Sequence, residues 1–325
     1  MSTNNSFSYA RFDGSVGKGT SRPEGQPGMF TEHMSPRFVD LDSWSTGDMT
    51  AAMYDGQLAA CAAVKPALPA INAAVDDAAA ALKRGGRLVY VGAGTSGRIA
   101  IQDGAELRPT YDWPAERLVF VMAGGMQAVV SSVEGAEDNE AKGAEAIAQA
   151  EVGSNDVVIA VAASGTTPFT IGALRCAGER GAVCVAVANN RGAPLFALAR
   201  HKILIETGTE VLAGSTRMQA GTAQKIVLNL FSTAVMVKLG RVYRGLMVSM
   251  RATNAKLLRR AEIIVSQIVG CDENAAAQFV QRADGDVKVA VLLALGWEHS
   301  DAVEALHRHE GSLRGVVDEL ARDAK

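Results

Sequence analysis

The sequence predicts an α/β fold, a three-layer sandwich around a five-stranded parallel sheet, followed by a small all-α module at the C-terminus. Short apolar β-runs alternate with helical stretches, as in parallel sheets with right-handed crossovers. Only 5% of the 325 residues are aromatic while 48% are hydrophobic, so the core must be built from Ala, Val, Leu and Ile. Beyond about residue 254 the β-runs stop, and glycines separate several short helical patterns.

The individual elements follow from local patterns. An Ala-rich helical stretch at 48–83 is interrupted near Pro66 and Pro69, which predicts two helices with a bend between them. A Gly-Gly pair ends this stretch, and β-runs follow at 87–91, 118–122, 157–161, 183–187 and 203–205. One long helical pattern covers 215–239. We expect a disordered tail at 1–28, a binding domain with the N-terminal helices at 29–253, and a helical module at 254–325.

Composition and charge exclude several classes of protein. The formal net charge of −3 offers no electrostatic footprint for nucleic acid or an anionic membrane surface. No apolar stretch approaches the ~20 residues of a membrane span, and the segment before residue 29 lacks the apolar centre of a signal peptide. The four cysteines are scattered, as expected for reduced thiols in the cytosol. His307 and His309 fall on different helix faces, so no metal site is predicted.

The sharpest local motif is Gly-Ala-Gly-Thr-Ser-Gly-Arg at 92–98, which follows a β-run and opens a helix. Its glycines permit a tight turn, its free N–H groups can face an anion, and Thr95 and Ser96 add hydroxyls or an N-cap. The motif fits the Gly-x-Gly-x-x-Gly pattern of dinucleotide sites. That reading expects an acidic residue at the end of the second strand, where this chain has Met122 to Gly125, while Asp112 comes before the strand. We therefore favour a monophosphate.

Two further hydroxyl-rich loops support this interpretation. Ser-Gly-Thr-Thr-Pro at 164–168 follows the third β-run, with Thr167 predicted as the N-cap and Pro168 as the first helical residue. Gly-Ser-Thr-Arg at 214–217 opens the long helix. Either loop alone could be only a well-capped helix start. Because ligands of open α/β sheets bind at the carboxyl ends of strands, where these loops lie, together they predict a sugar-phosphate site.

With these motifs in view, the chain resembles the N-acetylmuramic acid 6-phosphate etherase family, whose core is a sugar isomerase (SIS) domain. The resemblance extends from about Thr31 to the C-terminus. Its most specific strings are Val-Glu-Gly-Ala-Glu-Asp at 133–138 and Gly-Ser-Thr-Arg-Met at 214–218. The other matching pieces are Thr46 with its neighbours from residue 41, and residues 92–98, 103–110, 123–125, 162–165, 210–225 and 252–254.

The resemblance implies an activity and a place in the cell. The family removes D-lactate from the 3-position of N-acetylmuramic acid 6-phosphate, leaving N-acetylglucosamine 6-phosphate, and needs no metal or redox cofactor. It implies a cytoplasmic homodimer that recycles cell-wall amino sugar and has a small sugar phosphate as its ligand. The residues expected to bind the substrate are Gly94, Thr95, Ser96, Ser164, Gly165, Thr166, Glu210, Ser215 and Thr216.

The reaction needs a base for the C2 proton and an acid for the departing ether oxygen, after which water adds at C3 with the roles reversed. The family's two acidic residues fall on Glu106, which we expect to be the acid, and Glu137, which we expect to be the base. Without the resemblance, Glu106 could be a solvated carboxylate and Glu137 an acid favoured by a helix dipole.

Helix geometry separates Glu106 from its own phosphate loop. If residues 96–105 are helical, they span ~15 Å at 1.5 Å per residue, farther than a hexose phosphate reaches. We expect Glu106 to serve the site of a neighbouring subunit, unless the helix ends early at Gly104.

Five positions depart from the family pattern, and together they remove two cations and add one. They are Ala105 for a common serine, Arg108 for a usual proline, Met126 for a frequent glutamate, Thr166 for a common arginine and Gln219 for a usual lysine. The exact ether substituent therefore stays open.

Two other functions stay open on the sequence. An aldose–ketose isomerase of a sugar phosphate would use Glu210 for proton transfer. A regulatory protein that senses a sugar phosphate would need a basic DNA-reading module, which this sequence does not show.

Overall fold

The structure, a computed structural model, describes residues 30–250 and 254–323. The tail predicted at 1–28 lies outside the described residues, as do Ala252 and Thr253 of the motif at 252–254.

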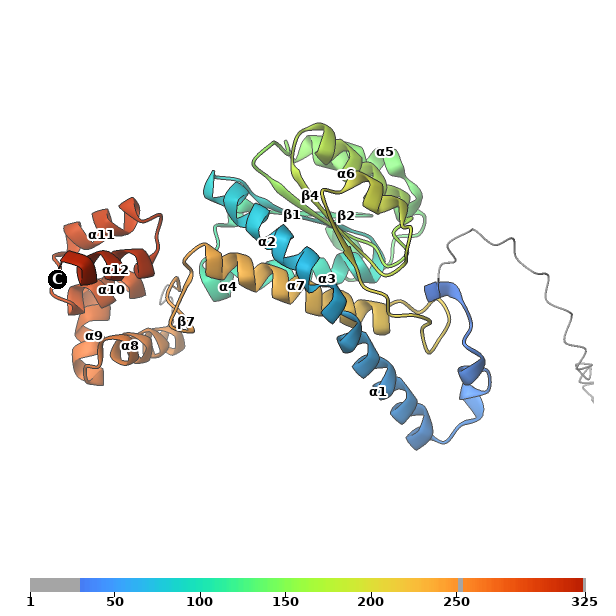
Figure 1. The fold of residues 1–325 in the computed structure, drawn as a ribbon, viewed down its shortest axis with the longest axis horizontal. Coiled ribbons are helices and arrows are strands. Elements are labelled where there is room, and N and C mark those ends of the chain that lie inside the picture. Colours follow the sequence, from blue (N-terminus) through green and yellow to red (C-terminus); the bar gives the residue numbers. More distant parts are fainter. Residues whose placement is uncertain (1–29, 251–253, 324–325) are drawn as a thin grey trace, which may run out of the picture.

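The five predicted β-runs form one parallel sheet in the order β2-β1-β3-β4-β5, which confirms the predicted fold class (Figure 1). The strands pair in register, with Gly92 opposite both Met122 and Val161. Their carboxyl ends therefore align along one edge of the sheet. The strands are β1 (Leu88–Gly92), β2 (Leu118–Met122), β3 (Val157–Val161), β4 (Val183–Ala188) and β5 (His201–Leu204).

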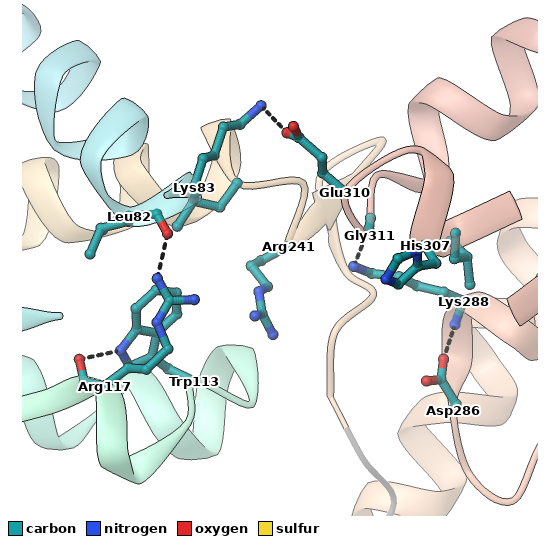
Figure 2. Close-up of a pocket in the computed structure, with 12 residues that line it drawn as sticks. Leu82, Lys83, Trp113, Arg117, Arg241, Asp286, Lys288, His307, Glu310 and Gly311 are labelled. Atoms are coloured by element: carbon teal, nitrogen blue, oxygen red, sulfur yellow. Dashed lines mark hydrogen bonds and ion pairs between the residues drawn. The ribbon is translucent and has the colours of Figure 1, made fainter. Parts of the chain in front are cut away.

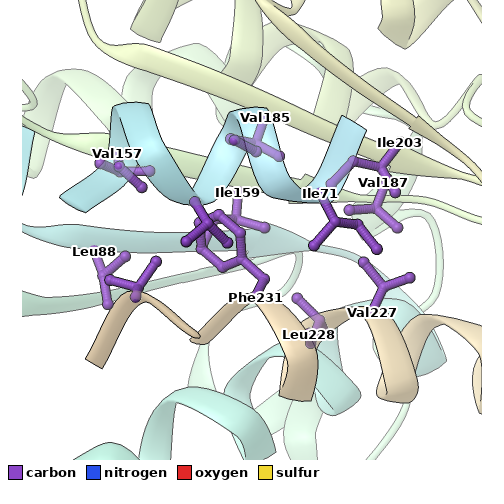
Figure 3. Close-up of a cluster of buried hydrophobic side chains, with 14 of the residues drawn as sticks. Ile71, Leu88, Val157, Ile159, Val185, Val187, Ile203, Val227, Leu228 and Phe231 are labelled. Carbon is purple, nitrogen blue, oxygen red and sulfur yellow. The ribbon is translucent and has the colours of Figure 1, made fainter. Parts of the chain in front are cut away.

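Alternating side chains give the sheet two buried faces, as the pleat of a strand requires. On one face, Leu88, Val157 and Ile159 pack against α2 (Leu68–Lys83) and α7 (Gln219–Lys238). Figure 3 shows Ile71 of α2 and Phe231 of α7 among these side chains, between the two helices. The other face packs against α5 (Glu140–Gln149) and α6 (Pro168–Glu179). Helix α3 (Gly94–Ala105) leads from β1 into α4 (Leu107–Tyr111).

The N-terminal helical stretch bends as predicted. Helix α1 (Thr46–Ala63) ends before a 3-10 turn at Lys65–Ala67, which contains Pro66, and α2 begins at Leu68. In Figure 1, α1 projects away from the sheet. It is largely exposed, whereas α2 buries seven residues in the core.

One finding corrects a sequence expectation. Among the described residues, Thr46–Lys83 is long and apolar enough to cross a membrane by length and composition alone, since an 18-residue window within it has a mean hydropathy of 1.5. The prediction that no stretch approaches this length was wrong, because alanines raise the mean hydropathy without forming an obvious apolar run. The α2 part of the stretch packs on the sheet as a core helix.

Five helices follow the α/β part of the described chain, which ends with α7, and their side chains form a separate hydrophobic cluster. They are α8 (Ala255–Val269), α9 (Glu273–Arg282), α10 (Val287–Ala294), α11 (His299–Arg308) and α12 (Leu313–Asp323). A short antiparallel pair, β6 (Val242–Tyr243) and β7 (Leu246–Met247), precedes them. Figure 1 shows this helical region beside the end of α7, away from α1. An ion pair between Lys83 and Glu310, 2.8 Å long, joins the helical region to α2.

Candidate active site

Three hydroxyl-rich loops meet at the carboxyl-terminal edge of the sheet. They enclose a cavity of about 390 Å³, within the range of small-molecule sites. Its walls are formed by Glu32, Ala93, Gly94, Thr95, Ser96, Glu137, Asp138, Ala162, Ala163, Ser164, Thr166, Thr167, Pro168, Gly214 and Thr216. The structure therefore brings six of the nine predicted substrate-binding residues, and one of the two predicted catalytic carboxylates, to a single cavity.

The first loop presents the N-terminus of α3 to this cavity. The helix begins at Gly94 with Ala93 at the N-cap, so the prediction that Thr95 or Ser96 caps it was wrong. Gly94 has φ +52°, a conformation that favours glycine, and starts the helix early enough to place both hydroxyls in the first turn. The first N–H groups of a helix have no partner within it and favour an anion. This end of α3 can therefore bind a phosphate.

The second loop turns sharply at Gly165, which has φ +70°. A Cβ at this position would lie 2.3 Å from the Cβ of Ala193, so only glycine fits the close approach. Gly165 itself does not line the cavity, but its turn aims Ser164 and Thr166 there. Ser164 Oγ accepts a hydrogen bond of 3.2 Å from the Thr166 N–H. Helix α6 begins at Pro168 with Thr167 as N-cap, as predicted, although the Thr167 side chain makes no capping hydrogen bond.

The third loop differs from its prediction. The long helix α7 begins at Gln219 rather than at Ser215, because residues 214–218 form tight turns that start with φ +74° at Gly214. Thr216 lines the cavity, whereas Ser215 does not.

Glu210 lies beneath the third loop and is fully buried. Its carboxylate accepts hydrogen bonds from the N–H groups of Gln219 at 2.8 Å and Ala220 at 2.9 Å. Burial raises the pKa of Glu210, and these two donors offset part of that rise. Glu210 does not line the cavity and instead caps α7.

The two predicted catalytic carboxylates lie in different places. Glu137 is exposed at the cavity, in a 3-10 turn at Ala136–Asp138. Glu106 is exposed at the far end of α3, at the C-cap, and is not part of the cavity wall. The helix continues past Gly104 to Ala105, so it does not end early, and the separation expected from helix geometry remains within one chain.

Arg98 and Asp103 of α3 do not line the cavity of the three loops, but they hold the elements around it in place. Arg98 Nε donates to the carbonyl oxygens of Ala128 and Val129, both at 3.1 Å, and thereby holds the loop that leads towards Glu137. Asp103 is buried and accepts hydrogen bonds from Asn229 at 2.7 Å and Tyr90 at 3.0 Å, which fasten α3 to α7 and β1.

The sequence analysis missed Glu32, which lines the cavity from the segment before α1. The neighbouring Thr31 is fully buried; its carbonyl accepts from the Gly214 N–H at 2.9 Å, and its hydroxyl accepts from Asn190 at 3.1 Å. A Cβ at Gly214 would lie 3.0 Å from Glu32 Oε2. No periodicity marks residues 30–32, so only long-range contacts reveal their position.

The structure also shows where two residues that depart from the family pattern lie. Thr166 stands in the cavity wall. Gln219 is buried, and its Oε1 accepts from the Val211 N–H at 3.1 Å, which ties it to the backbone below the third loop. In the described part of the chain, no group of three His, Cys, Asp or Glu side chains could hold a metal ion.

Comparisons with known proteins identify the family of this chain. The glucokinase regulatory protein N-terminal SIS domain matches residues 70–178, and the SIS domain matches residues 139–234. An N-acetylmuramic acid 6-phosphate etherase of Deinococcus radiodurans is 48% identical over 290 residues, which are 89% of this chain and 95% of that relative. A relative of the same name from Halalkalibacterium halodurans is 42% identical over 291 residues, covering 89% of this chain and 98% of the relative.

Among solved structures, a phosphoheptose isomerase from Francisella tularensis aligns with 60% of this chain and 100% of its own, at a TM-score of 0.44 and 16% identity. That likeness is too weak to bear on function. The etherase relatives, in contrast, match over nearly their whole length. The chain belongs to the N-acetylmuramic acid 6-phosphate etherase family, a group of carbon–oxygen lyases built on a SIS domain.

Proposed function

We propose that the cavity formed by the three hydroxyl loops binds N-acetylmuramic acid 6-phosphate, and that the protein cleaves its D-lactyl ether by elimination and hydration. The observation that carries this proposal is the meeting of Glu137 with the loops at 94–96, 164–168 and 214–216 in one cavity. In this arrangement a carboxylate stands beside a phosphate-type cradle, as proton transfer on a bound sugar phosphate requires.

The 6-phosphate is held by the first turns of α3 and α6 and the hydroxyls around them. Helix N-termini and hydroxyl donors stabilise a phosphate without a cation at the same place. This supports phosphate binding despite Thr166, which stands where arginine is common in the family.

The chemistry proceeds by proton transfer on the opened sugar. The C1 carbonyl acidifies the C2 proton, which Glu137 removes as general base. Loss of lactate from C3 requires a proton on the ether oxygen, and Glu106 supplies it as general acid. Water then adds to C3 while the roles reverse, which yields N-acetylglucosamine 6-phosphate and D-lactate. Each positioned acid or base of this kind contributes about 10²–10⁴ in rate.

We further propose that the protein acts in the cytoplasm as a homodimer, and the position of Glu106 supports the dimer. Glu106 and Glu137 of one chain do not share a cavity, so Glu106 completes the site of a second copy. The largely exposed α1, with Tyr54 and Leu58 on its surface, is available for such an assembly.

The direct test is to incubate the purified protein with N-acetylmuramic acid 6-phosphate and to assay D-lactate enzymatically. Release of D-lactate together with N-acetylglucosamine 6-phosphate is expected, and in heavy water the product should carry deuterium at C2. An aldose–ketose isomerase would release no lactate, and a sensing protein would bind the sugar phosphate without turning it over.

A further inference from the structure

A second cavity lies away from the three hydroxyl loops. It has a volume of about 630 Å³ and shares no wall residue with the candidate active site. Figure 2 shows Trp113, Arg117 and Arg241 on one side and Lys288 and His307 on the other. Its walls come from the segments before β1 and β2, from the chain just after α7, and from the C-terminal helices. It therefore lies near the amino ends of the strands, opposite the edge that carries the hydroxyl loops.

Besides Lys83, which pairs with Glu310, three cations line this cavity, and their side-chain hydrogen bonds go to neutral carbonyl groups. Arg117 Nε and Nη2 donate to the carbonyl of Gly86 at 3.0 and 2.6 Å, and Nη2 also donates to the carbonyl of Leu82. Arg241 Nη1 donates to two backbone carbonyls, at 3.2 and 3.3 Å. Lys288 Nζ donates to the carbonyl of Gly311 at 2.5 Å. None of these partners carries the negative charge that would offset a partly buried cation.

Two carboxylates, Asp286 and Glu310, also line the cavity, and Asp286 partly offsets the positive charge of Lys288. Asp286 Oδ1 accepts from the Lys288 N–H at 2.9 Å and the Val289 N–H at 3.1 Å, and so caps α10. Glu310 forms the ion pair with Lys83 at the rim. Asp112 raises the pKa of Arg241, and Glu116 raises the pKa of Arg117. In both arginines burial lowers the pKa by more than the carboxylate raises it.

Positive charge exceeds negative charge along the walls of this cavity. Burial lowers the pKa of Lys288 to about 8, and repulsion from Arg241 adds to this. Burial and the same arginine also lower the pKa of Arg117. Partly buried like charges cost free energy unless an opposite charge joins them. An anion between these three side chains would supply it.

The chemistry of the walls indicates which anion. Guanidinium groups match phosphate oxygens with paired donors, and a lysine adds a point charge. Three cations suit a dianion better than a single carboxylate. The Arg117 guanidinium stacks 4.5 Å from the Trp113 ring, which holds it in place beside the cavity.

We propose that this cavity is a second binding site, for a small phosphorylated metabolite whose phosphate contacts Arg117, Arg241 and Lys288. The ligand bridges the α/β part of the chain and the C-terminal helices, because Arg241 precedes β6 while Lys288 belongs to α10. Its binding therefore favours the docked arrangement of the two parts.

Calorimetric titration of the full-length protein with inorganic phosphate at pH 7 tests this site. Wild type should show two classes of site, one of them in the hydroxyl-loop cavity. Lys288→Gln and Arg241→Gln should each weaken the second class at least tenfold and leave the first unchanged. Lys256→Gln, an exposed lysine on α8 outside the cavity, is the matched control and should titrate like wild type. A single class in wild type, or unchanged titrations in both cavity variants, would overturn the proposal.

Two further measurements keep the test sound if a variant folds poorly. Lys288→Arg and Arg241→Lys preserve the charges and should retain the second class of phosphate site within a few-fold. Sulfate, a dianion that does not titrate in this range, should bind the wild-type cavity with proton uptake at pH 8, seen as a buffer-dependent heat. Sulfate binding without proton uptake at pH 8, or its full persistence in Lys288→Gln, would contradict the assignment. Titration with acetate separates a phosphate site from a general anion site, since acetate should bind far more weakly.

Discussion

At the scale of single residues, burial and charge give the polar side chains of this protein different roles. Glu137 is exposed at the first cavity, whereas the carboxylate of Glu210 is taken up in capping α7. Lys288 is buried next to another cation. Each of these environments leads to a measurable expectation.

We expect Glu137→Gln to lower the rate of D-lactate release by about 10²–10⁴ because it removes the base for the C2 proton. The fold should not change, since Glu137 is exposed. Initial rates at saturating substrate measure the loss. Glu145→Gln on α5, where the carboxylate pairs with Lys142 and accepts from Gln149 on the surface, is the control and should keep wild-type rates. Full activity in Glu137→Gln would remove this residue from the chemistry.

Lys288 makes the stability depend on alkaline pH. Its pKa is about 8 when folded against 10.5 as a model value, so between these values the unfolded chain binds more protons and stability rises with pH. The difference of 2.5 pH units corresponds to about 3 kcal/mol. The free energy of unfolding of wild type minus that of Lys288→Met should therefore rise by up to this amount between pH 7 and pH 10.5. Urea denaturation without phosphate measures both free energies. Lys256→Met should show no such trend, and a flat difference for Lys288→Met would refute the cause.

At the scale of elements, the loops work because particular residues permit or end a helix. Gly94 and Gly165 both have positive φ, but their surroundings differ. A Cβ at Gly94 would meet nothing within 4 Å, whereas one at Gly165 would overlap Ala193. Glu210 precedes the third loop and caps the helix that follows it, α7, across nine to ten residues.

The two glycines should respond differently to alanine. Gly94→Ala should cost only the strain of positive φ, about 1 kcal/mol. Gly165→Ala adds a steric overlap and should cost at least about 2 kcal/mol. Thermal unfolding of both variants gives the comparison, and Gly165→Ala should also raise KM because Ser164 and Thr166 follow its turn. Equal losses of stability would show that the loop yields to Ala193 more easily than its packing indicates.

Removing the cap of α7 should destabilise the protein. Glu210→Ala leaves two buried N–H groups without their acceptor, which costs about 1–3 kcal/mol. Glu206→Ala breaks only an exposed ion pair with Arg191 and should cost less than about 1 kcal/mol. The free energies of unfolding of the two variants should differ clearly. If Glu210→Ala is as stable as Glu206→Ala, the buried carboxylate is not the cap that its contacts indicate.

At the scale of the whole molecule, the two cavities described above lie at opposite edges of the sheet, and Glu106 lies exposed outside both. The proposed mechanism therefore requires a second chain to supply Glu106. The second cavity, in contrast, is complete within a single chain, because the C-terminal helices close it.

Mixed dimers test the shared active site. A Glu106→Ala chain keeps its loops, and a Ser96→Ala, Ser164→Ala chain keeps its Glu106. Mixed one to one, half of the dimers pair the two variants and hold one intact site, so about a quarter of wild-type activity should return in a two-fold symmetric dimer. Each variant alone should be inactive. With mixed dimers confirmed by native mass spectrometry, no recovery would rule the shared site out.

The local sequence determined the strands, the bend between α1 and α2, and the loops that follow β1 and β3, because glycine, proline and apolar runs act within a few residues. The start of α7 escaped prediction, since its cap, Glu210, and the turns at 214–218 depend on packing. Roles for Glu106 and Glu137 came from the family strings, not from periodicity.

Tertiary structure alone decided that Glu32 reaches the first cavity and that Arg117, Arg241 and Lys288 meet in the second. These side chains come from segments far apart in the chain, and no local pattern links them. Burial and the repulsion between like charges arise only when the fold brings them together, so the chemistry of the second cavity belongs to the folded protein.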